Sequence, residues 1–342
     1  MKILGIETSC DETACAIVED GKTILSNVIA TQIPFHKIYN GVVPEIASRK
    51  HAEWIMPVVK EALKEADLSL DNIDAIAATN KPGLMGALLV GLTFGKTLAW
   101  ATRKPFIAIN HMLGHMYAAH LENDISYPYL GLLVSGGHSI ICRVNNFDDI
   151  EILGTTIDDA IGEAFDKVAK FYSLGYPGGV IIDKLAQNGN SKAAEFPLPI
   201  LRGENHQYDM SYSGLKTAVI NQLDQFWKEG YPKTNENIAA AFQETAIKIL
   251  LSRLFRAVED TGLKTVVAGG GVAANSRLRS ILAKHTEINC IFPPLKLCTD
   301  NGAMIAGIAY HYLKRGETSS WTTTASPRIQ AFKRGLLRQH KP

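Results

Sequence analysis

Two histidines four positions apart, His111 and His115, stand in the stretch NHMLGHMYAAH, residues 110–120. On a helix this spacing places both rings on one face, within reach of a single metal ion. Zinc proteases of the H-E-x-x-H type share the spacing, but they carry a glutamate general base directly after the first histidine. Here that position is Met112. The stretch therefore indicates either a metal site without the hydrolytic base or a structural pair.

Asp300, in the stretch CTDNGAMIAG, is a candidate third ligand at an expected strand-to-helix junction. Two histidines and one carboxylate, with coordination positions left open, form a ligand set that suits a catalytic iron or zinc ion. A carboxylate just before a helix is equally typical of an N-cap. From the sequence alone, both roles stay open for Asp300.

Two polar turns follow predicted strands. In LLVSGGHS, residues 132–139, the backbone N–H groups around Gly136 and Gly137 can cradle a phosphate, because glycine permits a close approach. A plain hairpin turn explains the same residues. In ETSCDET, residues 7–13, Asp11 and Glu12 suit phosphate, a magnesium ion or proton transfer, although such residues are also common turn formers.

The stretch VVAGGGVAANSRLR contains a G-x-G-x-x-A pattern, which is typical of dinucleotide-binding folds. That pattern belongs on the first strand-to-helix turn of such a fold, whereas here it lies late in the chain. We therefore expect a nucleotide site of another type, with Asn275 at the helix start. The stretch GLTFGKT lacks the glycine spacing of a phosphate-binding P-loop and is rejected as one.

The stretch GEAFDKVAKFYSLGYPGGVIIDKLA carries Asp166, Gly179 and Asp183. These residues can contact a ribose or an amino acid, and the alternative is that they cap helices or lie in solvent. The stretch SYSGLKTAV, residues 211–219, is either an anion site or an ordinary helix start.

The elements that must position these residues occur twice. Three strands with polar turns begin near residue 2 and again near residue 129, which predicts an internal repeat and two α/β lobes with a cleft between them. Helical periodicity covers 45–66, 83–103, 158–173 and 236–260. We expect lobes at 1–125 and 126–317, a helical insertion around 186–235, and a polar basic tail over 318–342. The tail, with Arg328, Lys333, Arg334, Arg338 and Lys341, is expected to be either a solvated end or a contact with nucleic-acid phosphates.

The composition is that of an ordinary globular protein, with 46% hydrophobic and 20% charged residues among 342. A net charge of +1 means that any nucleic-acid surface must be a local patch. The five cysteines form no C-x-x-C pair, which favours reduced thiols in a cytosol. The N-terminus reads directly as a strand, and no apolar run is long enough to span a membrane. We therefore expect a cytoplasmic protein with no membrane partner.

Nine stretches together resemble one family, in the same order along the chain. They are GIETSCDETACAIV, GVVPEIASRKH, NHMLGHMYAAH, LLVSGGHS, TIDDAIGEAFDKVAK, GYPGG, SYSGLKTAV, GGGVAANSRLR and TDNGAMIA, from residue 5 to residue 306. The chain resembles the bacterial tRNA N6-adenosine threonylcarbamoyltransferases, once labelled O-sialoglycoprotein endopeptidases. The resemblance implies the duplicated actin/hexokinase/heat-shock-ATPase fold, which agrees with the two sets of strands.

The resemblance implies transfer of a threonylcarbamoyl group from threonylcarbamoyl-AMP to the adenosine immediately 3′ of the anticodon, in tRNAs that read codons beginning with A. It implies one iron or zinc ion on His111, His115 and Asp300. Magnesium bound together with a nucleotide is a further expectation. Asp11 or Glu12 would take the proton, and the metal would act as a Lewis acid and link the two lobes. The implied substrate contacts are Val134, Ser135, Gly136, Gly137, His138, Asp166, Gly179, Asp183 and Asn275. The implied protein partners are a paralogous actin-like protein and a small P-loop ATPase.

Four positions depart from the family pattern: Leu133, Asn40, Lys81 and Val180. Leu133 replaces the tyrosine metal ligand of the archaeal and eukaryotic branch, so another group must complete the metal's coordination. Two other functions compete with the transferase. A metalloprotease is disfavoured by Met112, and a non-catalytic ATP-binding regulator has no use for the histidine pair.

Overall fold

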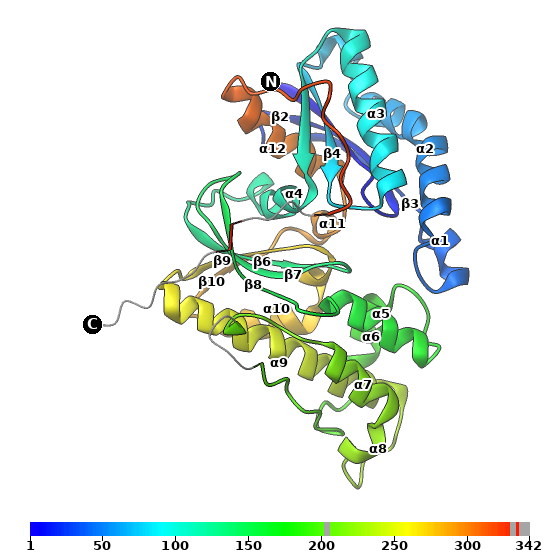
Figure 1. Ribbon diagram of the computed structural model, residues 1–342, viewed down its shortest axis with the longest axis vertical. Coiled ribbons are helices and arrows are strands. Elements are labelled where there is room, and N and C mark those ends of the chain that lie inside the picture. Colours follow the sequence, from blue (N-terminus) through cyan, green and yellow to red (C-terminus); the bar gives the residue numbers. More distant parts are fainter. Residues whose placement is uncertain (202–205, 329–332, 335–342) are drawn as a thin grey trace. The chain divides into compact units, whose positions relative to one another are not determined.

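The computed structural model describes residues 1–201, 206–328 and 333–334. The described chain forms two compact units (Figure 1). The first contains residues 1–125 and 293–328, and the second contains residues 126–292 and 333–334. This division differs from the expected lobes, because residues 293–317 belong with the first unit rather than the second.

The first unit is built on a five-stranded sheet in the order β3-β2-β1-β4-β5. The strands are β1 (Lys2–Glu7), β2 (Glu12–Glu19), β3 (Thr23–Thr31), β4 (Ala75–Lys81) and β5 (Phe106–Asn110). The first three are antiparallel neighbours, and β4 and β5 run parallel to β1. Strand β1 is almost continuously apolar because helices cover both faces of the sheet.

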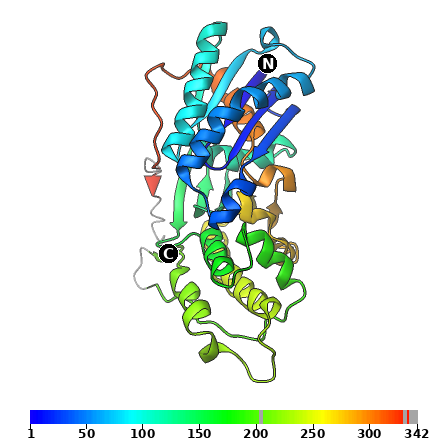
Figure 2. The same cartoon turned by 90° about the vertical axis from the view of Figure 1, so that its right-hand side faces the viewer.

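On one face, α2 (Pro44–Glu65) and α3 (Met85–Thr102) pack against the strands and bury Leu4, Ile6 and Ile17 in a common core. On the other face lies α12 (Gly302–Lys314) (Figures 1 and 2). A Cβ added at Gly5 would lie 2.5 Å from the backbone nitrogen of Ala306, so α12 touches β1 almost backbone to backbone. This contact is the physical reason why residues 293–317 return to the first unit.

The shorter elements of the first unit are α1 (Ile33–His36), η1 (Lys37–Tyr39), η2 (Leu70–Asn72), α4 (His111–Tyr117), η3 (Ala118–Leu121) and α11 (Leu295–Cys298). The expected helices at 45–66 and 83–103 are confirmed as α2 and α3. The rejected P-loop resemblance, residues 91–97, lies inside α3 and is helical.

The second unit repeats the topology of the first. Its sheet has the order β10-β9-β6-β7-β8-β11, with an antiparallel set of three strands followed by two parallel ones. The strands are β6 (Tyr129–Val134), β7 (Ser139–Val144), β8 (Ile150–Thr155), β9 (Thr265–Gly269), β10 (Asn289–Ile291) and β11 (Lys333–Arg334), which pairs with β8. The predicted internal repeat is therefore present in the structure.

The helices of the second unit are α5 (Ile161–Phe171), α6 (Gly178–Ala186), α7 (Ser213–Asn221), α8 (Leu223–Phe226), α9 (Asn235–Thr261), η5 (Gly271–Ala274) and α10 (Ser276–Leu282). Helix α9 begins at the Thr234 N-cap and ends at Gly262, whose φ of 69° is left-handed. The expected insertion, around 186–235, contains α7 and α8. No helix in the described ranges has both the length and the apolar character that a membrane crossing requires.

The start of the expected tail, residues 318–328, is held along the first unit, although most of its side chains are exposed. Figures 1 and 2 show it as the orange-red segment that runs beside α3. Ser319 N–H donates to the carbonyl of Phe106 at 2.8 Å, and the Trp321 ring stacks on Phe106. Lys96 donates from α3 to the carbonyls of Trp321 and Thr323. Of the basic tail residues, Arg338 and Lys341 lie outside the described residues.

We expect Lys96→Met to loosen this segment, because the ammonium group satisfies two of its carbonyls. Hydrogen bonds to a charged donor contribute about 1.5–3 kcal/mol, so the free energy of unfolding should fall by about that amount. Denaturant unfolding and limited proteolysis within residues 318–328 measure the effect. Lys60→Met on the exposed face of α2 is the matched control. Equal stability and protease resistance in the two variants would contradict this role of Lys96.

Candidate metal centre and substrate site

Helix α4 presents the two histidines from the carboxyl end of β5. Asn110 ends the strand and caps the helix, since its side chain accepts a hydrogen bond from Met112 N–H at 2.9 Å. The rings of His111 and His115 lie with their centroids 4.5 Å apart, and both residues are buried. The predicted shared helix face is therefore present.

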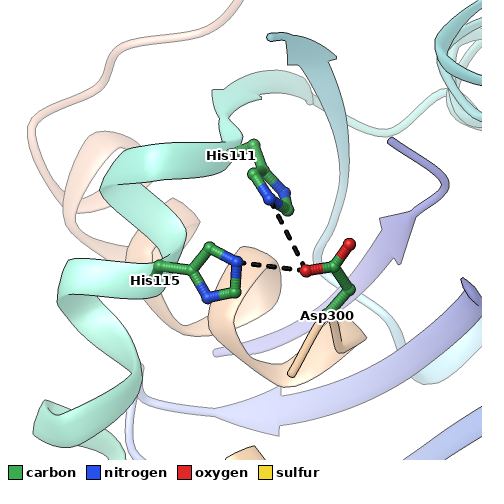
Figure 3. Close-up of side chains that lie close together, drawn as sticks. All are labelled: His111, His115 and Asp300. Atoms are coloured by element: carbon green, nitrogen blue, oxygen red, sulfur yellow. Dashed lines mark hydrogen bonds and ion pairs between the residues drawn. The ribbon is translucent and has the colours of Figure 1, made fainter. Parts of the chain in front are cut away.

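Asp300 lies between α11 and α12 and points at both histidines (Figure 3). Its Oδ1 is 3.1 Å from His115 Nε2 and 3.6 Å from His111 Nε2. One ligand atom from each of the three residues lies within 4.8 Å of the others. The N-cap of α12 is Asn301, which accepts from Met304 N–H. The capping interpretation of Asp300 was therefore wrong, and its carboxylate faces the histidines instead.

Glu7, at the end of β1, holds the far side of the His111 ring. Its Oε2 lies 3.0 Å from His111 Nδ1 and accepts a hydrogen bond from the Thr79 hydroxyl at 2.5 Å. Its other oxygen, Oε1, accepts from the Ser9 N–H at 2.5 Å. Glu7 is fully buried. These contacts fix the orientation of His111 and leave its Nε2 turned toward Asp300.

The charges in this group shift each other's pKa. Burial alone would lower the pKa of His111, but the negative charges of Glu7 and Asp300 raise it to about 9. Burial alone would raise the pKa of Asp300, but His111 and His115 hold it well below its usual range. The pKa of Glu7 is lowered because the attraction of His111 outweighs the effect of burial. Without a metal the two carboxylates are thus ionised and share a protonated His111 as their counter-ion, and a bound metal ion would have to replace that proton.

The acidic turn between β1 and β2 adjoins this group. The Ser9 hydroxyl lies 3.1 Å from His111 Nδ1, and the Ser9 carbonyl accepts from Leu84 N–H at 2.8 Å. Asp11 is buried, and Glu12 accepts from the Thr31 hydroxyl at 3.3 Å. Burial raises the pKa of Glu12 well above its usual value, and the charges of Asp11 and Asp300 raise it further. A carboxyl group with a raised pKa is suited to carrying a proton near neutral pH.

In the second unit, residues 135–138 form the turn between β6 and β7. Ser135 N–H donates to the His138 carbonyl at 2.8 Å, and His138 N–H donates to the Ser135 hydroxyl at 3.1 Å. The stretch is therefore a hairpin turn, as one interpretation predicted. A Cβ added at Gly136 or Gly137 would meet no atom within 4 Å, so the space beside both glycines is open to a ligand. Val134 is buried at the end of β6.

The other predicted substrate residues hold helix starts in place. Asp166 accepts from Gly178 N–H at 2.7 Å at the start of α6. Asp183 accepts from the Ser276 hydroxyl at 2.8 Å, and Asn275 caps α10 through Leu278 N–H. The capping roles are thus present in the structure, and the substrate roles remain predictions. A Cβ at Gly179 would also meet open space.

The predicted anion site at residues 211–219 is filled by the chain itself. Asp158 accepts from the Ser211 hydroxyl, from Tyr212 N–H and from the Ser213 hydroxyl at the start of α7. Lys216 pairs with Asp159 at 2.6 Å. Two carboxylates of the same unit therefore occupy the place where an external anion was considered.

Comparison with known proteins decides the family. The model of the tRNA N6-adenosine threonylcarbamoyltransferase family matches residues 23–307. The chain belongs to this family. A threonylcarbamoyltransferase of this name from Treponema denticola is 75% identical over 332 residues, which cover 97% of this chain and 98% of the relative. One from Treponema pallidum (strain Nichols) is 60% identical over 336 residues, covering 98% and 96%.

A solved structure supports the fold of the threonylcarbamoyltransferase chain. Component A of the (R)-2-hydroxyglutaryl-CoA dehydratase of Acidaminococcus fermentans matches it with a TM-score of 0.55, over 92% of this chain and 99% of that chain. The sequence identity is 16%, so the likeness concerns the fold alone. Together with the repeated sheet, it confirms the predicted duplicated α/β fold of the actin-like class.

The residues of this threonylcarbamoyltransferase fit a metal ion. Two imidazoles and one carboxylate form a donor set that suits iron or zinc. The Nε2 atoms of His115 and His111 lie 3.1 and 3.6 Å from the same oxygen of Asp300, so one ion could take the place of these direct contacts. All three residues belong to the first unit. The expectation that the metal links two lobes was therefore wrong.

Glu7 was not predicted as a site residue. Its signal in the sequence is a single carboxylate at the end of the apolar stretch KILGIE, a residue that is almost never fully buried without a partner. The partner, His111, is 104 positions away, so spacing could not reveal the pair.

We expect Glu7→Gln to lower the affinity for zinc or iron by about 10- to 100-fold, because loss of a carboxylate that orients a ligating histidine has effects of this size. Competition with a chromophoric chelator measures the affinity, and circular dichroism checks the fold. Glu65→Gln, an exposed change at the end of α2, serves as the control. Unchanged affinity in Glu7→Gln would show that the carboxylate does not support a metal ligand.

Proposed function

We propose that the chain transfers the threonylcarbamoyl group of threonylcarbamoyl-AMP to N6 of the adenosine immediately 3′ of the anticodon, in tRNAs that read codons beginning with A. The observation that carries this proposal is the 75% identity to a threonylcarbamoyltransferase over nearly the whole of both chains. In the reaction, N6 forms a bond to the carbamoyl carbon, the bond from that carbon to the phosphate oxygen breaks, and AMP leaves. One proton must leave N6.

Glu12 is our candidate for the proton acceptor, with Asp11 as its charged neighbour. The exocyclic amine of adenine is a weak nucleophile, so both its orientation and removal of its proton contribute to the rate. Burial and the charges of Asp11 and Asp300 raise the pKa of Glu12, which makes its carboxylate a stronger proton acceptor. Asp11 contributes the adjacent negative charge that keeps this pKa high.

His111, His115 and Asp300 would hold one iron or zinc ion, which supplies a Lewis acid for the carbamoyl oxygen. The open turn at Ser135, Gly136 and Gly137 would hold the AMP phosphate through backbone N–H groups. A magnesium ion would bind together with the nucleotide. The remaining substrate contacts are proposed at Val134, His138, Asp166, Gly179, Asp183 and Asn275. Several of these also hold helix starts, so their loss would alter the shape of the site as well as its contacts.

A metalloprotease is not favoured. The position of the general base is occupied by Met112, which is buried and carries no titratable group. A non-catalytic ATP-binding regulator does not account for two buried histidines aimed at one carboxylate.

The proposed partners are tRNA, threonylcarbamoyl-AMP, a paralogous actin-like protein and a small P-loop ATPase. We place the reaction in the cytoplasm, where its tRNA substrate is found. The five free cysteines agree with a reducing compartment.

Supply of the activated donor tests the reaction. Given preformed threonylcarbamoyl-AMP, tRNA and the partner proteins, the chain should form threonylcarbamoyl-adenosine and release AMP. Given threonine, bicarbonate, ATP and tRNA alone, it should form none, because it carries no recognised site for making the adenylate. Nucleoside mass spectrometry measures both outcomes. Product in the second incubation would contradict the proposed division of labour, and no product in the first would contradict the transferase function.

A substitution tests the proton acceptor. Glu12→Gln should lower kcat by about 10²- to 10⁴-fold, the usual contribution of a general base, and change the KM for the adenylate little. Glu19→Gln, at the opposite end of the same strand, is the matched control and should retain full activity. A rise in KM with unchanged kcat would assign Glu12 to substrate binding instead.

A further inference from the structure

Large apolar side chains are unusually exposed in the segment Ile33–Tyr39, which consists of α1 and η1. The exposed fractions are 41% for Phe35, 75% for Ile38 and 51% for Tyr39. No other five-residue stretch in the described ranges exposes three such side chains. A concentration of exposed apolar surface of this kind marks a binding surface.

Hydrogen bonds of two buried side chains, His36 and Gln32, hold the backbone of this segment in place. His36 is fully buried, its Nδ1 accepts from Val43 N–H at 3.3 Å, and its Nε2 lies 3.3 Å from Gln32 Oε1. The Gln32 side chain in turn donates to the carbonyl of Ala47 on α2. The exposed side chains therefore project from an anchored turn, which lowers the entropy cost of binding to them.

Positive charge is interleaved with the exposed rings. Lys50 Nζ lies 4.8 Å from the centroid of Phe35, but it is also paired with Glu53 at 2.6 Å, so Lys50 contributes little uncompensated charge. Lys37 is exposed between Phe35 and Ile38, and no ion pair holds it within the described part of the chain. Lysine is depleted in the apolar centres of protein–protein interfaces, so this mixture favours a polyanion with planar groups over a protein partner.

The segment begins beside the acidic turn of the candidate site. Gln32 N–H donates to the carbonyl of Asp11 at 2.9 Å, and the Thr31 hydroxyl donates to Glu12 at 3.3 Å. Both contacts lie within the first unit. A ligand lying on Ile33–Tyr39 would thus reach the residues to which we assign proton transfer.

We propose that the exposed face of Ile33–Tyr39 is the surface on which unpaired bases of the tRNA anticodon loop stack. This inference rests on the proposed function, which places the target adenosine next to the anticodon. Proteins recognise single-stranded RNA by stacking its unpaired bases on aromatic side chains, while cations neutralise the phosphates. Tyr39 and Phe35 supply the rings, Ile38 supplies apolar area, and Lys37 meets a phosphate.

Binding of an anticodon stem-loop RNA to the full chain tests the surface. Tyr39→Ala should weaken binding by roughly fivefold or more, the size of effect measured for one base–aromatic stack. Tyr39→Phe keeps the ring and should bind like the wild type. Lys37→Ala should lower the slope of log affinity against log salt by about 0.7, the value for one phosphate contact on a single strand. Trp100→Ala, which removes a 71% exposed ring from α3, is the matched control.

Transfer assays with preformed threonylcarbamoyl-AMP distinguish a failure of the proposed RNA surface from a failure of the proposed function. Tyr39→Ala should raise the KM for tRNA and leave the KM for the adenylate unchanged. If the wild type transfers the group but Tyr39→Ala binds and uses tRNA as the wild type does, the surface is not an RNA contact and the inference fails alone. Loss of partner-protein binding in Tyr39→Ala, with RNA affinity unchanged, would also overturn it. If the wild type transfers nothing, the proposed function itself has failed.

Discussion

The close contact between α12 and β1 is the constraint on which the candidate metal centre depends. The backbone of α12 approaches β1 at Gly5 and β2 at Gly302 so closely that a Cβ on either glycine would overlap its neighbour. This approach sets the position of the loop before α12, and that loop carries Asp300. The carboxylate thereby comes to lie opposite His111 and His115, which are about 190 positions earlier in the chain. If either glycine carried a side chain, α12 would have to lie further from the sheet.

The same contact brings several charges together in a buried place. Glu7 and Asp300 are both negative, and burying two carboxylates so near each other is unfavourable unless positive charge compensates them. His111 provides that compensation between them, which is why its pKa rises while theirs fall. A divalent ion at the same place would serve the same electrostatic purpose with a larger charge. The polar surroundings of the histidines thus suit a cation and would penalise an apolar group.

Local patterns predicted much of the fold. Apolar periodicity located α2, α3, α5 and α9, and the recurrence of three strands revealed the duplicated topology. The i, i+4 spacing placed His111 and His115 on one helix face, because that relation is local. The predictions that failed concerned contacts between residues that are far apart in the sequence. Nothing local to residues 293–328 indicates that they pack on strands near the N-terminus, and two of the partners of Glu7, Thr79 and His111, lie 72 and 104 positions away. Capping was also misjudged at Asp300, since Asn301 is an equally good cap one residue later.

The first unit is discontinuous in sequence, and this has a consequence for synthesis on the ribosome. Domains generally fold as units while the chain emerges from the N-terminus. Residues 1–125 emerge early, yet the helix that covers one face of their sheet, together with Asp300, follows only after residues 126–292 of the second unit have been made. The second unit, most of which is one continuous stretch, can complete its core first. The candidate metal ligands therefore come together late in synthesis, when almost the entire chain exists, and a chain truncated before α12 would have one face of this sheet uncovered.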